Sequence, residues 1–140
     1  MTFEANWKSN PMPFDLLIVD DSAAIRKILQ RVLQKAEAPI GNVYEAGDGV
    51  EALAVMRAKN VNLVLSDINM PNMDGLQLLP QIRANEEWKT IPVILITTEG
   101  SQAKVMEAAH MGATGYVRKP FTPEQINHVL AGLVGSPVGA

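Results

Sequence analysis

Cysteine is missing from this 140-residue chain, which excludes disulfide bonds, thiolate metal sites and thiol catalysis. Long hydrophobic runs are missing too. No apolar stretch approaches the roughly 20 residues that cross a bilayer, so we expect no membrane insertion. The first ten residues lack the apolar core of a secretory signal, and we therefore expect a cytoplasmic protein. No run of Lys and Arg occurs and the net charge is −3, which argues against a nucleic-acid partner.

The composition that remains is that of one globular domain. Hydrophobic residues make up 47% of the chain and charged residues 19%, and this length suits a single core. Residues 1–13 are polar and contain two prolines near their end, so we interpret them as a flexible leader. The domain is expected over residues 14–134, followed by a tail at 135–140.

Short apolar segments alternate with segments that repeat apolar residues at helical spacing. Strands are expected at 14–19, 42–46, 61–66, 91–96 and 115–117. Helices are expected after Ser22, Asp48, Ser101 and Thr122, and over 73–83. Asp48 and Glu51 have the spacing of a capping box, and Thr122 with Gln125 combines an N-cap and an N3 glutamine. Pro80 predicts a kink or early stop in its helix. This alternation predicts a doubly wound α/β fold, a parallel sheet with helices on both faces.

Polar side chains stand where these strands end. The first strand is followed by Asp20 and Asp21, the third by Asp67, the fourth by Thr97 and the fifth by Lys119. Parallel strands bring these ends to one edge of the sheet, where ligands bind. Like charges 4 Å apart repel by roughly 4 kcal/mol at an effective dielectric of 20, so the carboxylates must take up protons or bind a cation.

Oxygen ligands of this kind suit Mg²⁺, with Mn²⁺ as a substitute. A metal, an ammonium group and a hydroxyl are what phosphoryl transfer requires, and a carboxylate can serve as its nucleophile. Asp67, alone at its strand end, is the candidate. Each residue also has a simpler interpretation when it is taken alone: a helix cap for Asp20 and Asp21, a turn residue for Asp67, and a solvated cation for Lys119.

The combined motifs identify a resemblance. They are Asp20-Asp21, Asp67-Ile68-Asn69-Met70-Pro71-Asn72-Met73-Asp74-Gly75, Thr97-Thr98-Glu99 and Tyr116-Val117-Arg118-Lys119-Pro120-Phe121. This pattern resembles the receiver domain of bacterial two-component response regulators, most of all the single-domain chemotaxis type. The resemblance covers about residues 14–134. It implies a five-stranded sheet of order 2-1-3-4-5, for which the chemotaxis regulator is itself a standard example.

The resemblance also implies residue roles at the strand ends. Asp67 would accept a phosphoryl group from a histidine kinase. Asp20, Asp21, Asp67 and the backbone carbonyl of Asn69 would hold Mg²⁺, with Asp20 acting through a bound water. Lys119 would bind a phosphoryl oxygen, and its bond to Pro120 would be cis.

Further residues are implied in switching and in the lifetime of the phosphoryl group. Thr97 would move towards the phosphoryl group and Tyr116 would turn inward behind it, which would remodel the face of the fourth helix, fifth strand and fifth helix for a downstream target. Asn69 and Glu99 would influence hydrolysis. The expected protein is thus a monomeric, stand-alone receiver in chemotaxis or motility control that acts by protein contact and is not an enzyme.

Several other functions stay open at this point. A phosphorelay intermediate or a regulator in a stress or other pathway would share the same motifs. An aspartyl-nucleophile phosphatase would need an acid two residues after Asp67, where Asn69 stands. A flavin carrier on the same fold would meet repulsion from Asp20 and Asp21. A receiver-shaped adaptor without phosphorylation is disfavoured because all five chemical positions are present. The cognate kinase, the target, the phosphoryl lifetime and the role of residues 1–13 are not readable from the sequence.

Overall fold

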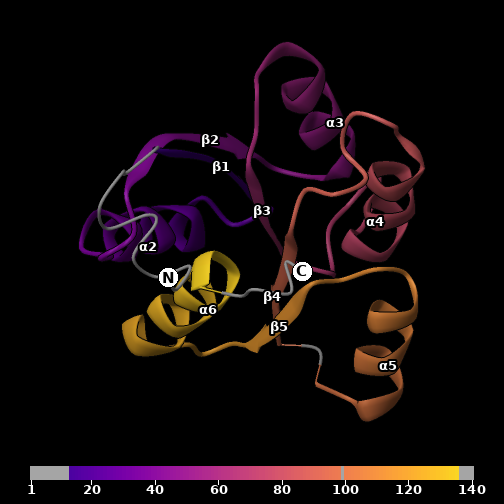
Figure 1. Ribbon diagram of the computed structural model, residues 1–140. Coiled ribbons are helices and arrows are strands. Elements are labelled where there is room, and N and C mark those ends of the chain that lie inside the picture. Colours follow the sequence, from indigo (N-terminus) through magenta and orange to yellow (C-terminus); the bar gives the residue numbers. More distant parts are fainter. Residues whose placement is uncertain (1–12, 99, 136–140) are drawn as a thin grey trace.

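The computed structural model describes residues 13–98 and 100–135 and contains one five-stranded parallel sheet. Its strand order is β2-β1-β3-β4-β5, which confirms the doubly wound α/β fold expected from the sequence (Figure 1). The strands are β1 (Phe14–Val19), β2 (Ile40–Ala46), β3 (Leu63–Ser66), β4 (Val93–Thr97) and β5 (Gly115–Arg118). The helices are α2 (Ala23–Gln34), α3 (Gly49–Ala58), α4 (Gly75–Ala84), α5 (Gln102–His110) and α6 (Pro123–Gly135).

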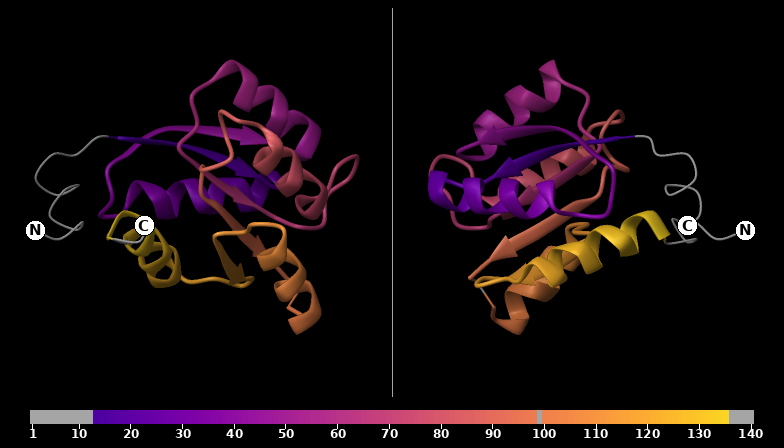
Figure 2. Two further views of the ribbon diagram at one scale, coloured as in Figure 1. Left: turned by 45° about the vertical axis from the view of Figure 1, so that its right-hand side comes forward. Right: turned by 90° about the vertical axis from the view of Figure 1, so that its left-hand side faces the viewer.

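Alternate residues of the central strands enter two separate cores. Leu16 and Ile18 of β1 pack with Leu29 of α2 and Leu130 of α6, whereas Leu17 joins the core under α3, α4 and α5. Helices α2 and α6 therefore cover one face of the sheet and α3, α4 and α5 cover the other (Figure 2). Because β1, β3 and β4 are buried on both faces, they are continuous apolar runs rather than alternating ones.

Side-chain caps fix where most helices begin. Ser22, Asp48 and Ser101 each accept a hydrogen bond from a backbone N–H three residues later, as the sequence predicts. At α6 the predicted start is complete, because Thr122 and Gln125 exchange side-chain and backbone hydrogen bonds.

The expected capping box of α3 is only half right. Asp48 caps the helix, but the Glu51 carboxylate accepts from the Gly47 N–H at 2.9 Å rather than from Asp48. The box that sequence inspection missed is at α4, where Asp74 and Gln77 cap each other.

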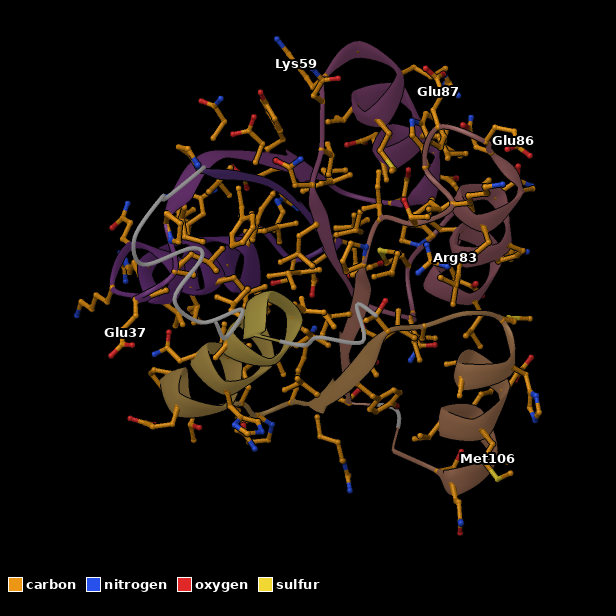
Figure 3. The ribbon with its side chains drawn as sticks, in the orientation of Figure 1. Glu37, Lys59, Arg83, Glu86, Glu87 and Met106 are labelled. Atoms are coloured by element: carbon orange, nitrogen blue, oxygen red, sulfur yellow. The ribbon has the colours of Figure 1, made fainter. Side chains whose placement is uncertain are left out.

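Pro80 does not stop its helix, so of the two predicted effects, a kink or an early stop, the early stop is wrong. Helix α4 continues to Ala84, because Leu78, Leu79 and Ile82 are buried in the core and hold the helix to the sheet. At its C-terminal end Arg83 donates from Nε to the Gly112 carbonyl at 2.9 Å and from Nη1 to the Ile91 carbonyl at 2.7 Å (Figure 3). Burial by tertiary contacts outweighs the lost backbone hydrogen bond of proline.

Other boundaries differ by a few residues. Strand β2 begins at Ile40 rather than residue 42, and β3 begins at Leu63 rather than residue 61. The predicted leader and tail lie, apart from Pro13 and Gly135, outside the described residues. Among the helices of the described part, none is long and apolar enough to cross a membrane.

Candidate functional site

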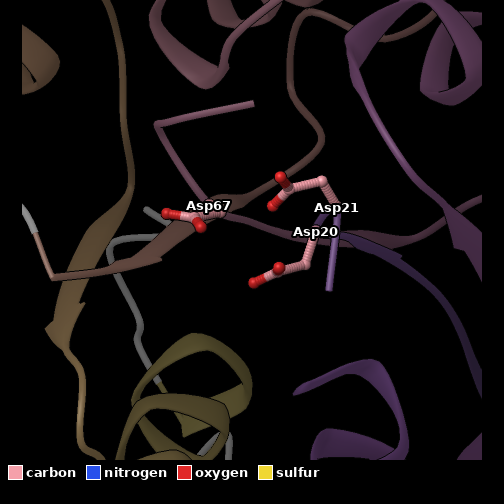
Figure 4. Close-up of side chains that lie close together, drawn as sticks. All are labelled: Asp20, Asp21 and Asp67. Carbon is pink, nitrogen blue, oxygen red and sulfur yellow. The ribbon is translucent and has the colours of Figure 1, made fainter. Parts of the chain in front are cut away.

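The carboxyl edge of the sheet gathers the predicted acids. One carboxylate oxygen from each of Asp20, Asp21 and Asp67 lies within 4.8 Å of the other two (Figure 4). Asp20 and Asp67 are buried, while Asp21 is exposed. Strand order explains the meeting: β1 pairs with β3, so the residues that follow Val19 and Ser66 emerge side by side.

Lys119 follows β5, an outer strand of the sheet, and reaches this cluster along the same carboxyl edge. Its Nζ donates to Asp20 Oδ2 at 2.6 Å and to Asp67 Oδ2 at 3.0 Å. Burial lowers the pKa of Lys119, but the hydrogen bonds to Asp20 and Asp67 outweigh it, so the pKa is raised above its ordinary value. The ammonium group therefore stays charged at neutral pH and offsets one of the three carboxylates.

The backbone fixes the Asp67 carboxylate and the segment after it. Asp67 Oδ1 accepts from the Ile68 N–H at 2.7 Å, and the Asp67 N–H donates to the Val19 carbonyl at 2.8 Å. The Gly75 N–H closes the loop on the Ile68 carbonyl at 2.8 Å. A Cβ on Gly75 would collide with the Asp67 carbonyl oxygen, so only glycine lets α4 start directly beneath the strand end.

The Asp20–Asp21 segment is held separately. The Asp20 N–H donates to the Ala46 carbonyl at 3.0 Å, and Asp20 Oδ1 accepts from the Ser22 N–H at 2.9 Å. Arg26 from α2 donates to the Asp20 carbonyl and to Glu45 at 2.8 Å. The two acids are thus presented by a segment tied to both α2 and β2.

Three of the remaining predicted residues lie in the described part of the chain. Thr97 is fully buried as the last residue of β4, the strand beside β3, and its carbonyl accepts from the Lys119 N–H at 2.9 Å. Asn69 is exposed in the loop after Asp67. Tyr116 is half-buried on β5 and packs against the core of the α3–α5 face. Glu99 lies outside the described residues.

The predicted cis peptide bond between Lys119 and Pro120 is present. The sequence does not reveal a contact between Asp48 and Asn72, in which the Asn72 amide donates to the Asp48 carboxylate at 2.7 Å. The two residues are 24 positions apart. The only sequence signal is the predicted cap at Asp48, which accounts for the contact of Oδ1 with the Glu51 N–H but not for the contact of Oδ2 with Asn72.

The donor set fits a small divalent cation. Three carboxylates from two adjacent strand ends would supply hard oxygen ligands and leave the remaining positions to water, as Mg²⁺ prefers. One ammonium group does not balance three carboxylates, so a further positive charge is favoured here.

Comparison with known proteins agrees with this geometry. The chemotaxis protein CheY-3 of Vibrio cholerae is 40% identical over 115 residues, which cover 82% of this chain and 87% of the relative. A chemotaxis protein CheY homologue of Campylobacter jejuni is 37% identical over 127 residues, covering 89% and 95%. The solved structure of V. cholerae CheY4 superposes with a TM-score of 0.77 at 37% identity, over 85% of this chain and 97% of that one. Residues 16–131 match the response regulator receiver domain, and the chain belongs to that family.

Proposed function

We propose that this receiver accepts a phosphoryl group on Asp67 from a histidine kinase and signals by binding a target protein in the phosphorylated state. The observation that carries the proposal is the position of Asp67. Strand β3 is the middle strand, with the acids of β1 on one side and Thr97 of β4 on the other. Among the three acids, only Asp67 therefore follows a strand that lies between the strand of the other two acids and the strand of Thr97.

The proposed reaction is a direct displacement. A carboxylate oxygen of Asp67 attacks the phosphorus of a phosphohistidine, the P–N bond breaks with its electron pair staying on the imidazole, and an acyl phosphate forms. Lys119, already 3.0 Å from Asp67 Oδ2, would hold one phosphoryl oxygen. Asp20, Asp21, Asp67 and the Asn69 carbonyl would hold Mg²⁺, which supplies charge neutralisation for the transferring group.

Thr97 and Tyr116 would carry the signal outward. In this proposal Thr97 turns to hydrogen-bond a phosphoryl oxygen and Tyr116 moves inward behind it, which alters the face of α5, β5 and α6. A cavity of about 610 Å³ lies on that face, lined in part by Tyr116, Arg118 and His128. Met106 of α5 is a large hydrophobic side chain that is 53% exposed. A target protein would dock here.

The relatives favour chemotaxis or motility control as the pathway, since two of them carry chemotaxis names. A phosphorelay intermediate or a regulator of another pathway is the second candidate, because it would use the same site with a different partner. In either case the protein works in the cytoplasm and catalyses only its own phosphorylation and dephosphorylation. Asn69 and Glu99 would set the lifetime of the acyl phosphate.

Intact mass spectrometry tests the proposal. The protein is incubated with acetyl phosphate and MgCl₂, and a gain of one phosphoryl group is expected in wild type but not in Asp67→Asn. The variant is nearly isosteric, and amide NMR verifies its fold. Multiple turnovers of a generic phosphomonoester would instead establish a phosphatase, and absence of any mass gain would favour a non-phosphorylated adaptor.

The output is tested by capture on immobilised protein. Phosphorylated wild type should retain a partner that Asp67→Asn does not, and substitution of exposed Met106 by Ser should weaken that capture without changing phosphorylation. Equal capture by both forms of the protein would contradict a phosphorylation-dependent target.

A further inference from the structure

Asp48 uses its two carboxylate oxygens for two different segments. Oδ1 accepts from the Glu51 N–H at 2.9 Å and caps α3. Oδ2 accepts from the Asn72 side-chain amide at 2.7 Å, across to the loop that follows Asp67. The residue is only 5% exposed, although it stands between a helix start and a surface loop. One buried carboxylate thus ties the start of α3 to the loop of the candidate site.

The loop is shaped to make this contact. Asn72 has φ +66°, a left-handed conformation that asparagine tolerates better than most residues. The Met73 N–H donates to the Pro71 carbonyl at 2.7 Å, which closes a tight turn around Asn72. The Met73 carbonyl accepts from the Gly49 N–H at 2.9 Å, and a Cβ on Gly49 would overlap the Met73 side chain. The turn is therefore packed directly on the first residue of α3.

We propose that Asp48 is a positioning residue for the divalent metal, acting through Asn72 on the backbone carbonyl of Asn69. The inference rests on the proposed function, because it is the proposed function that makes the Asn69 carbonyl a metal ligand. Asn69 is itself exposed and lies three residues before Asn72. Its loop is fixed on one side by Asp67 and on the other by the Asn72–Met73 turn. Mg²⁺ demands near-octahedral geometry at about 2.0–2.1 Å, so a loop that has lost the contact between Asn72 and Asp48 would present the Asn69 carbonyl less well.

Two substitutions separate this role from helix capping. Asp48→Ser keeps an effective cap, but its single, shorter oxygen does not reach Asn72. Asn72→Gly removes the amide and keeps the positive φ. Glu51→Ala is the matched control: it deletes the 2.9 Å hydrogen bond to the Gly47 N–H at the same helix start and leaves the loop contact in place.

The readout is the Mg²⁺ dissociation constant of the full chain. MgCl₂ is titrated at constant ionic strength and amide NMR shifts are followed, with urea unfolding measured in parallel. Loss of an outer-shell partner raises metal dissociation constants by 10- to 100-fold, and we expect roughly 10-fold in Asp48→Ser and in Asn72→Gly. The double variant should bind Mg²⁺ no more weakly than the single variant with the lower affinity, because both substitutions remove the same contact. Glu51→Ala should bind Mg²⁺ about as well as wild type.

The outcomes distinguish the two levels of the proposal. If wild type binds Mg²⁺ and both loop variants bind it equally well, the positioning role is overturned and the proposed function stands. If Glu51→Ala weakens Mg²⁺ binding as much as Asp48→Ser and Asn72→Gly do, the effect comes from general loosening of α3, and the positioning role is overturned. If wild type shows no saturable Mg²⁺ binding, the metal part of the proposed function and this inference both fail. Should Asp48→Ser not fold, Asn72→Gly decides, because glycine is favoured at its backbone conformation.

Discussion

Replacing Asp21 with Asn is expected to stabilise the metal-free protein and to reverse the order of stability when Mg²⁺ is added. Asp21 is the acid to change because it is exposed and, within the described residues, its carboxylate has no hydrogen-bond or ion-pair partner. Asp20 and Asp67 each hold Lys119, so removing either would also leave that ammonium group less well paired. The Asp21→Asn substitution removes one negative charge with little change in side-chain volume.

The expected magnitude comes from the spacing of the acids. Two unit charges at 4.8 Å repel by about 3.5 kcal/mol at an effective dielectric of 20. Lys119 offsets part of this repulsion and solvent screens the exposed Asp21, so we expect a gain of about 1 kcal/mol without metal. Mg²⁺ at ten times its dissociation constant would stabilise wild type by about 1.4 kcal/mol. The variant, lacking one ligand, would gain much less.

The assay is urea unfolding of both proteins in EDTA and in MgCl₂ at equal ionic strength. Glu37→Gln is the charge-matched control, because Glu37 is exposed after α2 and extends away from the sheet edge (Figure 3). It should change stability little and leave the Mg²⁺ response intact. The reasoning would be refuted if Asp21→Asn were less stable than wild type in EDTA, or if Mg²⁺ stabilised both equally.

Two further predictions concern the segments that hold the site. Gly75→Ala should cost at least about 2 kcal/mol and reduce phosphorylation, since its Cβ meets the Asp67 carbonyl; Gly132→Ala, in open space on α6, should instead stabilise by about 0.5–1 kcal/mol. Urea unfolding compares the pair, and equal effects would contradict the steric argument. The hydrogen bond from Asn72, with that from the Glu51 N–H, holds the pKa of Asp48 below its usual 3.8. The cost of Asp48→Ala should therefore be full at pH 6 and shrink as the pH falls below 3.8; a cost that stays constant down to pH 3 would count against the carboxylate.

The sequence predicted the fold well where one local signal dominates. The run that ends at Val19, the hydroxyl of Ser22 and the Thr122–Gln125 pair each fix an element without help from distant residues. Pro80 shows the opposite case. Its local cost predicts a kink or an early stop. The helix nevertheless continues past Pro80, because Leu78, Leu79 and Ile82 are buried, and burial depends on the tertiary structure.

The site was predictable because the sheet topology alone determines which strand ends share an edge. Once the strands are parallel, Asp20, Asp21, Asp67 and Lys119 must meet at one edge, and the structure brings these four together. The contact between Asp48 and Asn72 was not predictable. It depends on how a loop folds back on a neighbouring helix, which no spacing in the sequence encodes.

Chemical mapping of the phosphorylated residue tests the central claim most directly. The protein is phosphorylated with acetyl phosphate and MgCl₂ and then reduced with borohydride, which converts an aspartyl phosphate to homoserine, and peptides are sequenced by mass spectrometry. We expect homoserine at position 67 and nowhere else. Homoserine at position 20 or 21, with position 67 unmodified, would contradict the assignment of Asp67 as the phosphoryl acceptor.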